Sequence, residues 1–489
     1  MKFFREDGWT VKTPAFNPYL PSYEYVPDGE PRVFGDRLYV YGSHDRFGGK
    51  DFCLNDYVCW SAPLEDLGDW RYEGVIYRAT QDPKNAKGNQ HMNAPDCIQG
   101  PDGRYYLYYQ LHVLKCSSVA VADTPVGPFE FYGYVQHPDG VPYGDKKGDT
   151  FAFDPGVLVD DDGKVYLYVG FTPKGMFKMV FTLRGNQADE SVCLRLDSDM
   201  KTVLAQTPMI PGPDKAVGTD FAGHGFFEAS SIRKIGDTYY FVYSSELSHE
   251  LCYATSKHPD RDFRYGGTLV SIADIGYKGN ILPQNYTGNT HGGMVQIGEQ
   301  WYIFYHRQTN RVKCARQGCA EKILIRPDGS IDQVEITSCG LNDGPLPGVG
   351  TYEARIACKL RGPVPMVKSD FAMKEDKKGL LPYFTQTGED REDHPDQYIA
   401  NLCSGSEAGF KYFDLKRPEK LRVTVRGAEG KIGVLTERGG ETLAVIPVSD
   451  AADWTEFSAP TLRVAEGKCA LFFRYMGRGA IDFKDFTIE

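Results

Sequence analysis

The sequence predicts an all-β protein made of a five-bladed β-propeller, residues 1–340, followed by a β-sandwich domain, residues 345–489. Three observations lead to this prediction. A hairpin pattern recurs five times in the first two-thirds of the chain. The composition combines 53 glycines and 30 prolines with 31 tyrosines, which favours strands joined by many turns. No stretch shows a long helical period, and 489 residues are more than one domain usually needs.

Each of the five hairpins has a polar residue, a short apolar strand, a glycine-containing turn and an aromatic-rich strand. The first is PRVFGDRLYVYGS, and the others lie within residues 94–110, 153–170, 227–245 and 290–307. The repeats are 60 to 74 residues apart, measured between Tyr39, Tyr106, Tyr166, Tyr240 and Tyr302. This spacing leaves room for two more strands, as in a four-stranded propeller blade. The alternative is an all-β sandwich with similar hairpins, and five hairpins at near-regular spacing argue against it.

A change in composition after residue 335 marks the second domain. The stretch QVEITSCGLNDGPLPGVG is rich in glycine and proline and reads as a connector. Beyond it follow the strand-like segments KLRVTVRG, KIGVLTERG, TLAVIPVS and KCALFFRYMG. Turns separate them at intervals of about 8–12 residues, which is typical of a β-sandwich.

Charge, hydropathy and cysteine spacing limit the partners and the compartment. The formal charge of −11 disfavours nucleic acid, and no apolar run approaches the about 18 residues of a membrane span. The N-terminal MKFFREDGWTVKT lacks the apolar core of a signal peptide, so we expect a cytoplasmic protein. None of the 12 cysteines forms a CxxC pair, which favours reduced thiols. A zinc site at Cys314 and Cys319 would lack a second pair of ligands.

Acidic residues open most of the hairpins. In a propeller the first strand of every blade lines the central channel, so equivalent residues should converge near the axis. The polar residues at this position are Asp28 (with Glu30 two residues on), Asp96, Asp154, Glu228 and His291. Converging carboxylates repel one another and cost desolvation, so their retention indicates a function. The alternatives are structural: a turn residue at Asp28, a strand cap at Asp96 and an ion pair at Glu228.

Two carboxylates facing each other across a pocket are the minimum for hydrolysis of a glycosidic bond. Glu228 suits the general acid, because Phe226 and Phe227 would exclude water and raise its pKa. Asp28 or Glu30 suits the base on a more open, glycine-rich stretch. Asp96 would be a third carboxylate that orients the acid or raises its pKa.

These motifs resemble glycoside hydrolase family 43, whose members are five-bladed, inverting glycosidases. The resemblance rests on PDGEPRVFGDRLYVYGS, NAPDCIQGPDGRYYLYY, FDPGVLVDDDGKVYLYVG and FFEASSIRKIGDTYYFVYSS. It implies Asp28 as general base, Asp96 as pKa modulator and Glu228 as general acid, with acid and base roughly 6.5–9.5 Å apart. The family usually has Asp-Pro at the base, whereas Asp28 is followed by Gly-Glu-Pro. A match on the proline would put Glu30 there instead, and we favour Asp28.

The resemblance also implies further site residues and no required cofactor. His291 would lie on the propeller axis, where some members hold a structural calcium ion or a water cluster. Arg307 would hold a sugar hydroxyl or the base. Glu30, His44, Asp45 and Asp154 are further candidates for binding substrate. The C-terminal part resembles carbohydrate-binding modules of family 6, through KCALFFRYMGRGAIDFKDFTIE, and a structural lid is the alternative.

Together these features predict an exo-glycosidase that removes terminal α-L-arabinofuranosyl or β-D-xylosyl units from plant-type oligosaccharides. The expected partner is therefore an oligosaccharide, with no nucleic acid and no membrane. Two other functions fit the same fold. One is an exo-enzyme on galactosyl or galactofuranosyl units, and the other is a non-catalytic sugar-binding propeller. Apolar residues beside Glu228 would keep a catalytic acid protonated, whereas a protein that only binds sugar has no need of them.

Overall fold

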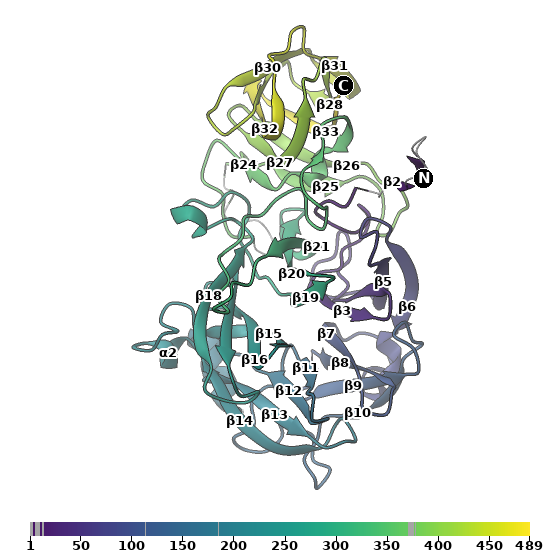
Figure 1. Ribbon diagram of the computed structural model, residues 1–489, viewed down its shortest axis with the longest axis vertical. Coiled ribbons are helices and arrows are strands. Elements are labelled where there is room, and N and C mark those ends of the chain that lie inside the picture. Colours follow the sequence, from purple (N-terminus) through teal and green to yellow (C-terminus); the bar gives the residue numbers. More distant parts are fainter. Residues whose placement is uncertain are drawn as a thin grey trace.

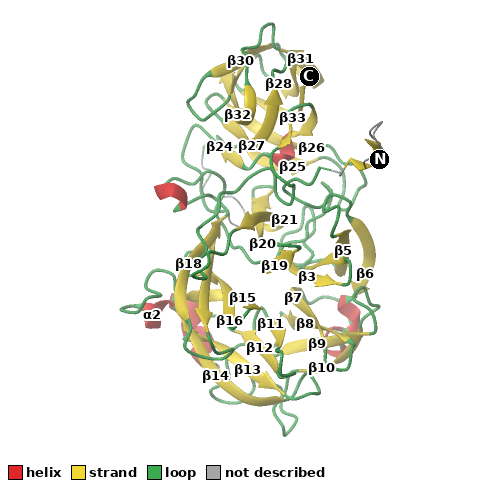
Figure 2. Cartoon of the chain, viewed as in Figure 1, coloured by secondary structure: helices red, strands yellow, loops and turns green. Residues whose placement is uncertain are grey.

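Five small antiparallel sheets stand around one axis, and two larger sheets form a second body beside them (Figure 1). The computed structural model describes residues 3–4, 10–11, 14–112, 114–183, 185–369, 376 and 378–489. Strands and loops make up almost all of the described chain, and helices are few and short (Figure 2). The predicted all-β class is therefore confirmed. No described helix has the length and apolarity to cross a membrane.

Each propeller blade is a sheet whose strands follow one another in sequence order. Blades I and II contain β3 (Glu30–Phe34), β4 (Arg37–Tyr41), β5 (Tyr57–Pro63), β6 (Arg71–Tyr77), β7 (Met92–Gln99), β8 (Tyr105–Leu111), β9 (Ser117–Ala122) and β10 (Glu130–Tyr134). Blades III and IV contain β11 (Gly156–Val159), β12 (Val165–Val169), β13 (Glu190–Leu196), β14 (Val203–Pro211), β15 (Phe226–Ile235), β16 (Thr238–Ser245), β17 (Glu250–Ser256) and β18 (Arg264–Ser271). Blade V contains β19 (Met294–Ile297), β20 (Gln300–Thr309) and β21 (Val312–Ile323).

The first strand of every blade is innermost (Figure 1). Neighbouring inner strands contact each other in the order β3, β7, β11, β15 and β19, and β19 contacts β3 in turn. The predicted hairpins join the two inner strands of each blade. In blade I Phe34 pairs with Arg37 around Gly35, whose φ of 61° a glycine adopts without strain.

Tyrosine-rich apolar clusters fill the spaces between adjacent blades. Alternate residues of a strand point to opposite faces, so each blade presents one set to the blade before it and one to the blade after it. Between blades III and IV, for example, Tyr168 packs against Phe241 at a ring separation of 5.8 Å. Such clusters occur at all five blade junctions, including the one between blades V and I. The aromatic second strands noticed in the sequence therefore build the propeller core.

The C-terminal strands form the predicted β-sandwich. One sheet contains β22 (Leu346–Pro347), β24 (Lys359–Arg361), β27 (Glu407–Lys416), β29 (Gly430–Leu435), β30 (Thr442–Val448) and β32 (Glu466–Gly477). The other contains β23 (Gly350–Glu353), β25 (Tyr383–Gln386), β26 (Gln397–Cys403), β28 (Leu421–Gly427), β31 (Ala451–Ser458) and β33 (Ala480–Ile488). Their facing sides share one apolar core around Phe410, Phe473 and Phe486. The predicted boundary at 340–345 falls between β21 and β22.

The remaining elements are short. They are β1 (Phe3–Phe4) and β2 (Thr10–Val11), the α-helices α1 (Gly175–Leu183) and α2 (Pro213–Ala216), and the 3-10 helices η1 (Ala79–Gln81), η2 (Pro83–Asn85), η3 (Tyr277–Gly279) and η4 (Ala354–Ile356).

Candidate active site

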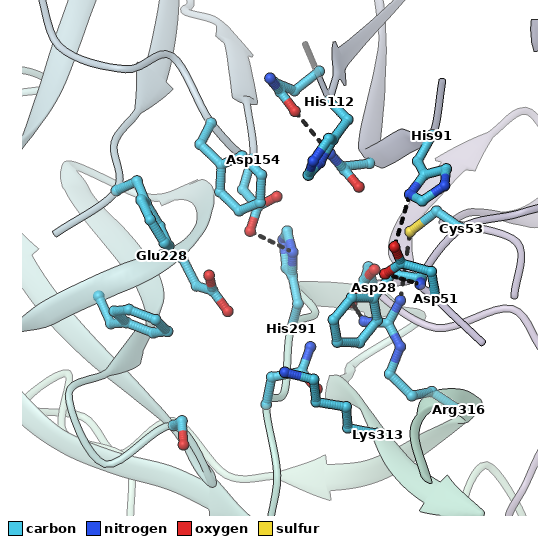
Figure 3. A pocket seen from close by; sticks show the side chains of 18 of the residues that line it. Asp28, Asp51, Cys53, His91, His112, Asp154, Glu228, His291, Lys313 and Arg316 are labelled. Atoms are coloured by element: carbon cyan, nitrogen blue, oxygen red, sulfur yellow. Dashed lines mark hydrogen bonds and ion pairs between the residues drawn. The ribbon is translucent and has the colours of Figure 1, made fainter. Parts of the chain in front are cut away.

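A cavity of about 900 Å³ lies where the inner strands of the propeller begin (Figure 3). Asp28 and Asp154 each precede their inner strand by two residues, His291 precedes β19 by three, and Glu228 is the third residue of β15. All four line the cavity. The prediction that equivalent polar residues converge near the axis is therefore confirmed for four of the five blades.

Asp28 faces the cavity as an ionised carboxylate. Its Oδ1 accepts a hydrogen bond from Arg316 Nη1 at 2.8 Å and lies 3.2 Å from His306 Nδ1. His306 donates its Nε2 proton to the Asn289 carbonyl oxygen (2.8 Å), so its Nδ1 can accept from the backbone N–H of Asp28 (3.3 Å). Burial would raise the pKa of Asp28, but the charge of Arg316 above all holds it well below its usual range.

Asp45 fixes the arginine that holds Asp28. Its Oδ2 accepts from Arg316 Nε at 2.8 Å and from the Arg316 backbone N–H at 3.1 Å, while its Oδ1 accepts from Nη2 at 3.0 Å. Asp45 is fully buried and also accepts from the backbone N–H of Cys53 at 3.0 Å. The prediction that Asp45 binds substrate is therefore wrong. It positions Arg316, and Arg316 positions Asp28.

Glu228 points into the cavity from the side opposite Asp28 (Figure 3). The pairing of β15 with β16 shifts register on both sides of Glu228, and Ala229 has a φ of 70°. Such a bulge turns a strand side chain out of its regular direction, here into the cavity. Burial and the negative charge of Asp154 raise the pKa of Glu228 to about 8. Glu228 therefore carries a proton at neutral pH.

Phenylalanines form the wall beside Glu228. The ring of Phe227 lies 5.3 Å from Phe171, Phe171 lies 5.2 Å from Phe153, and Phe153 stacks on Phe151 at 5.7 Å. All four line the cavity. The predicted apolar surroundings of the acid are thus present, but Phe226 takes no part. Adjacent strand residues point to opposite sides, and Phe226 is buried in the core between blades III and IV.

Asp154 and His291 form an ion pair between Glu228 and Asp28 (Figure 3). Asp154 Oδ2 lies 3.5 Å from His291 Nδ1. Burial would lower the pKa of His291, but Asp154 above all, followed by Asp28 and Glu30, raises it to about 9. Asp28 and Asp154 have φ angles of 57° and 45°, so both adopt the left-handed conformation that is uncommon for residues other than glycine. Strain of this kind often occurs at functional sites.

Asp96 does not reach the cavity, and its predicted place beside the acid is wrong. It is fully buried and accepts from Arg32 Nε (3.0 Å), Arg32 Nη2 (2.5 Å) and the backbone N–H of Val157 (2.8 Å). These contacts join the inner strands of blades I, II and III. The residue of β7 that lines the cavity is Asn93, and a register shift in β7 separates Asn93 from Asp96. Asp51 and Asp154 are the further carboxylates of the cavity, and Asp154 is the one whose charge raises the pKa of Glu228.

Glu30 is held by an arginine of blade IV. Its Oε2 accepts from Arg233 Nη2 at 2.8 Å, and Glu30 is not among the residues that line the cavity. Asp28 precedes the strand and has a φ of 57°, so the face alternation of β3 does not extend to it and the two carboxylates do not share a strand face. Asp28 lines the cavity and Glu30 does not, so the predicted place of Glu30 among the substrate-binding residues is wrong.

His44 and Arg307 also lie outside the cavity, contrary to prediction. His44 contacts the Asp56 carbonyl oxygen at 2.7 Å and Arg391 Nη1 at 2.9 Å. Arg307 is buried beneath the β-sandwich, where it donates to the Ala357 carbonyl oxygen at 3.1 Å and lies 3.8 Å from the centre of the Phe384 ring. Both side chains contact the C-terminal domain, which their sequence motifs did not indicate.

Several cavity residues escaped the sequence analysis. Arg316 and Lys313 come from β21, a strand without an aromatic motif, and Lys368 and Ser369 come from the segment after the propeller. Lys368 Nζ donates to the Ser248 hydroxyl at 3.0 Å. The segment VKCARQGCAEKI has no motif that singles out Arg316, and the burial of β21 is visible only in the structure.

The residues around His291 do not fit direct calcium coordination. Calcium takes about 6–8 oxygen ligands, whereas the axis offers an imidazole that already pairs with Asp154 and carries a proton at neutral pH. In the described part of the chain, three ligand atoms of His, Cys, Asp or Glu converge within 4.8 Å only elsewhere, on blade IV.

Comparisons with known proteins find one family and several relatives that match this chain. The model of glycosyl hydrolases family 43 matches residues 26–331, a segment that spans all five blades. A xylosidase/arabinosidase of Thermoclostridium stercorarium is 51% identical over 483 residues, which cover 98% of this chain and 99% of the relative. A xylosidase/arabinosidase of Bacteroides ovatus is 30% identical over 59% of this chain and 87% of its own. A solved family 43 arabinoxylan arabinofuranohydrolase from Bacillus subtilis, in complex with cellotetraose, shares the fold over 97% of this chain and 99% of its own, with 20% identity and a TM-score of 0.52. This chain therefore belongs to glycosyl hydrolases family 43.

Proposed function

We propose that the protein is an inverting exo-glycosidase that releases terminal α-L-arabinofuranosyl or β-D-xylosyl units from plant-type oligosaccharides. One observation carries the proposal. Asp28 and Glu228 face each other across one cavity, and their pKa values are displaced in opposite directions. A glycosidase needs this pair, since one carboxyl group must be protonated and the other ionised at the same pH.

In the proposed reaction Glu228 donates its proton to the glycosidic oxygen as the bond to the leaving group breaks. Asp28 removes a proton from a water molecule, and that water attacks the anomeric carbon from the opposite face of the sugar. Arg316 keeps the Asp28 carboxylate ionised, and His306 helps to orient Asp28 by accepting from its backbone N–H. The negative charge of Asp154 keeps Glu228 protonated before the reaction. The role of pKa modulator thus passes from Asp96 to Asp154.

The choice of a pentose rests on the site and on the relatives together. The two relatives with the highest identities reported above are both named xylosidase/arabinosidase. The four phenylalanines on the acid side offer an apolar wall, which suits the face of a sugar ring. A purely sugar-binding propeller would gain nothing from a carboxyl group whose pKa is raised to about 8.

We also propose that the C-terminal domain braces the active site. Lys368 and Ser369 line the cavity, and Ser369 hydrogen-bonds to the Thr287 carbonyl oxygen at 3.1 Å. The Asp390 carboxylate accepts from the backbone N–H of Phe47 at 2.7 Å and from Asn55 Nδ2 at 3.0 Å. Asn55 and Phe47 flank the loop that carries Phe52 of the cavity wall. These contacts support the lid alternative, and binding of carbohydrate by the sandwich stays a prediction.

A cytoplasmic location is part of the same proposal. All 12 cysteines lie in the described residues, and each is a free thiol. Free thiols in this number suit a reducing compartment.

A panel of nitrophenyl glycosides tests the proposed function. We expect turnover of the α-L-arabinofuranoside or the β-D-xyloside, and release of single pentoses from short xylo-oligosaccharides or arabinoxylo-oligosaccharides. Faster turnover of a galactoside or galactofuranoside would mean that the substrate carries a terminal hexose and not a pentose. Binding of sugars without turnover of any glycoside would contradict catalysis.

A further inference from the structure

A second cluster of reactive side chains lies on blade IV, separate from the catalytic carboxylates. It consists of His224, just before β15, with Glu250 and Cys252 two residues apart on β17. Glu250 and Cys252 are buried, whereas the His224 side chain is 32% exposed. In the described residues this is the one set in which ligand atoms of three His, Cys, Asp or Glu residues come within 4.8 Å of one another.

The three ligand atoms already stand at distances that suit a metal ion. His224 Nδ1 lies 2.7 Å from Glu250 Oε1, Cys252 Sγ lies 3.3 Å from the same oxygen, and Sγ and Nδ1 are 3.9 Å apart. These separations put the three atoms on a circle of about 2.0 Å radius, close to the Zn–N, Zn–O and Zn–S bond lengths of about 2.0–2.3 Å. An ion slightly out of their plane would reach all three with little rearrangement.

From this geometry we propose that His224, Glu250 and Cys252 bind one transition-metal ion of the Zn²⁺ class. A nitrogen, a sulfur and a carboxylate oxygen form a ligand set that Zn²⁺ accepts and that the oxygen-seeking Ca²⁺ and Mg²⁺ do not. Binding replaces the Cys252 S–H proton and the His224 Nδ1 proton, which both leave to solvent, by bonds from Sγ and Nδ1 to the metal. The partly exposed His224 edge leaves a path for the ion and a fourth position for water.

Hydroxyl groups around the cluster would support the ligands. The Ser245 hydroxyl donates to Glu250 Oε1 at 2.6 Å, and Thr268 donates to Glu250 Oε2 at 3.1 Å. The ring of Tyr265 stacks on His224 with centres 5.0 Å apart. Such second contacts orient metal ligands, and they fix the carboxylate and the imidazole here.

The ion would join two segments that build the active site. His224 precedes the acid Glu228 by four residues, and Ser248 of the cavity wall precedes Glu250 by two. A bond from β15 to β17 through the metal would hold the start of the acid-bearing strand against the turn that carries Ser248. The role is structural, so the proposal stands whether or not the substrate assignment is correct.

Metal titration of the intact protein tests this inference. After removal of metal with a chelator, we expect one equivalent of Zn²⁺ to bind and to raise the melting temperature. Co²⁺ in its place should give a thiolate-to-metal charge-transfer absorption. Cys252→Ser should abolish that absorption, and His224→Gln should weaken Zn²⁺ binding by at least about tenfold.

Two control variants match these changes outside the cluster. Cys193→Ser alters another buried thiol, on β13, and His137→Gln alters another histidine paired with a carboxylate, 2.9 Å from Asp149. Both should keep the absorption and the affinity of the wild-type protein. Because His224 is partly exposed, its variant should fold even where Cys252→Ser does not. Absence of a charge-transfer absorption in the wild type, or equal Zn²⁺ affinity in wild type and His224→Gln, would overturn the proposal.

Discussion

Removing the negative charge of Asp154 should make the catalytic acid lose its proton at a lower pH. The pKa of Glu228 rises from 4.5 to about 8, which corresponds to a preference of about 5 kcal/mol for the protonated form. Burial is the largest cause of this rise and Asp154 is the second. In Asp154→Asn the negative charge of Asp154 disappears while burial remains, and Asp28 and Glu30 still favour the positive charge of His291, so we expect the pKa of Glu228 to fall by about 1–2 units.

The sign of the effect follows from the role of Glu228. The acid acts when protonated, so kcat/KM decreases as pH rises through its pKa, and the variant should show this decrease near pH 6.5 instead of pH 8. At pH 8 the protonated fraction would drop about fifteenfold, whereas at pH 5 it would change little. The position of the decrease is the informative readout, because a mere loss of substrate contact would lower the rate at every pH alike.

The assay is the pH dependence of kcat/KM on a pentoside, with Asp96→Asn as the matched control. Asp96 pairs with Arg32 outside the cavity, so its replacement should leave the high-pH decrease of kcat/KM (the basic limb of the profile) at the same pH. It should instead lower the free energy of unfolding by about 3 kcal/mol, since it weakens a buried ion pair. The reverse pattern, with a shifted limb in Asp96→Asn and none in Asp154→Asn, would refute the reassignment of the modulator.

Three further changes test the neighbouring contacts. Glu228→Gln should lower kcat/KM on natural oligosaccharides by about 10²–10⁴-fold, but much less on nitrophenyl substrates, because their leaving group needs no proton. Equal losses on both kinds of substrate would argue against the acid role. Arg316→Lys should raise the pKa of Asp28, because the single ammonium group of lysine cannot contact both Asp28 and Asp45 as the guanidinium does. The increase of kcat/KM on the acidic side of the pH profile should then occur at higher pH, and an unchanged position in a folded variant would contradict this. Phe227→Ala should lower the pKa of Glu228 by admitting water, so kcat/KM should decrease at a lower pH while the stability stays nearly unchanged. Phe226 is buried, so Phe226→Ala should instead lower the free energy of unfolding by about 3–5 kcal/mol, measured as unfolding at lower denaturant concentration.

The fold was readable from the sequence because its repeating unit is local. A hairpin such as Phe34-Gly35-Asp36-Arg37 depends on residues that are neighbours in the chain, and its glycine must adopt a positive φ. Five such units at near-regular spacing leave few architectures. The equivalence of their first strands then brought Asp28, Asp154 and Glu228 together correctly.

The predictions of site residues were wrong where strand register or contacts between distant segments determine where a side chain lies. Counting back from the tyrosine of blade II selects Asp96, but β7 shifts register between Asn93 and Asp96, so Asn93 faces the cavity. No local pattern connects Asp45 with Arg316, which are 271 residues apart yet form three hydrogen bonds. Motifs locate strands well, but they do not tell a carboxylate that faces substrate from one that holds an arginine.

The stereochemistry of the released sugar tests the central claim most directly. Proton NMR of the first products, recorded before mutarotation, distinguishes the two anomers of the pentose. With Asp28 activating water opposite Glu228, a β-D-xyloside should release α-xylose first, and an α-L-arabinofuranoside should release β-arabinose first. Initial release of the anomer that matches the substrate would mean retention through a covalent intermediate, and would contradict the assignment of Asp28 as a general base.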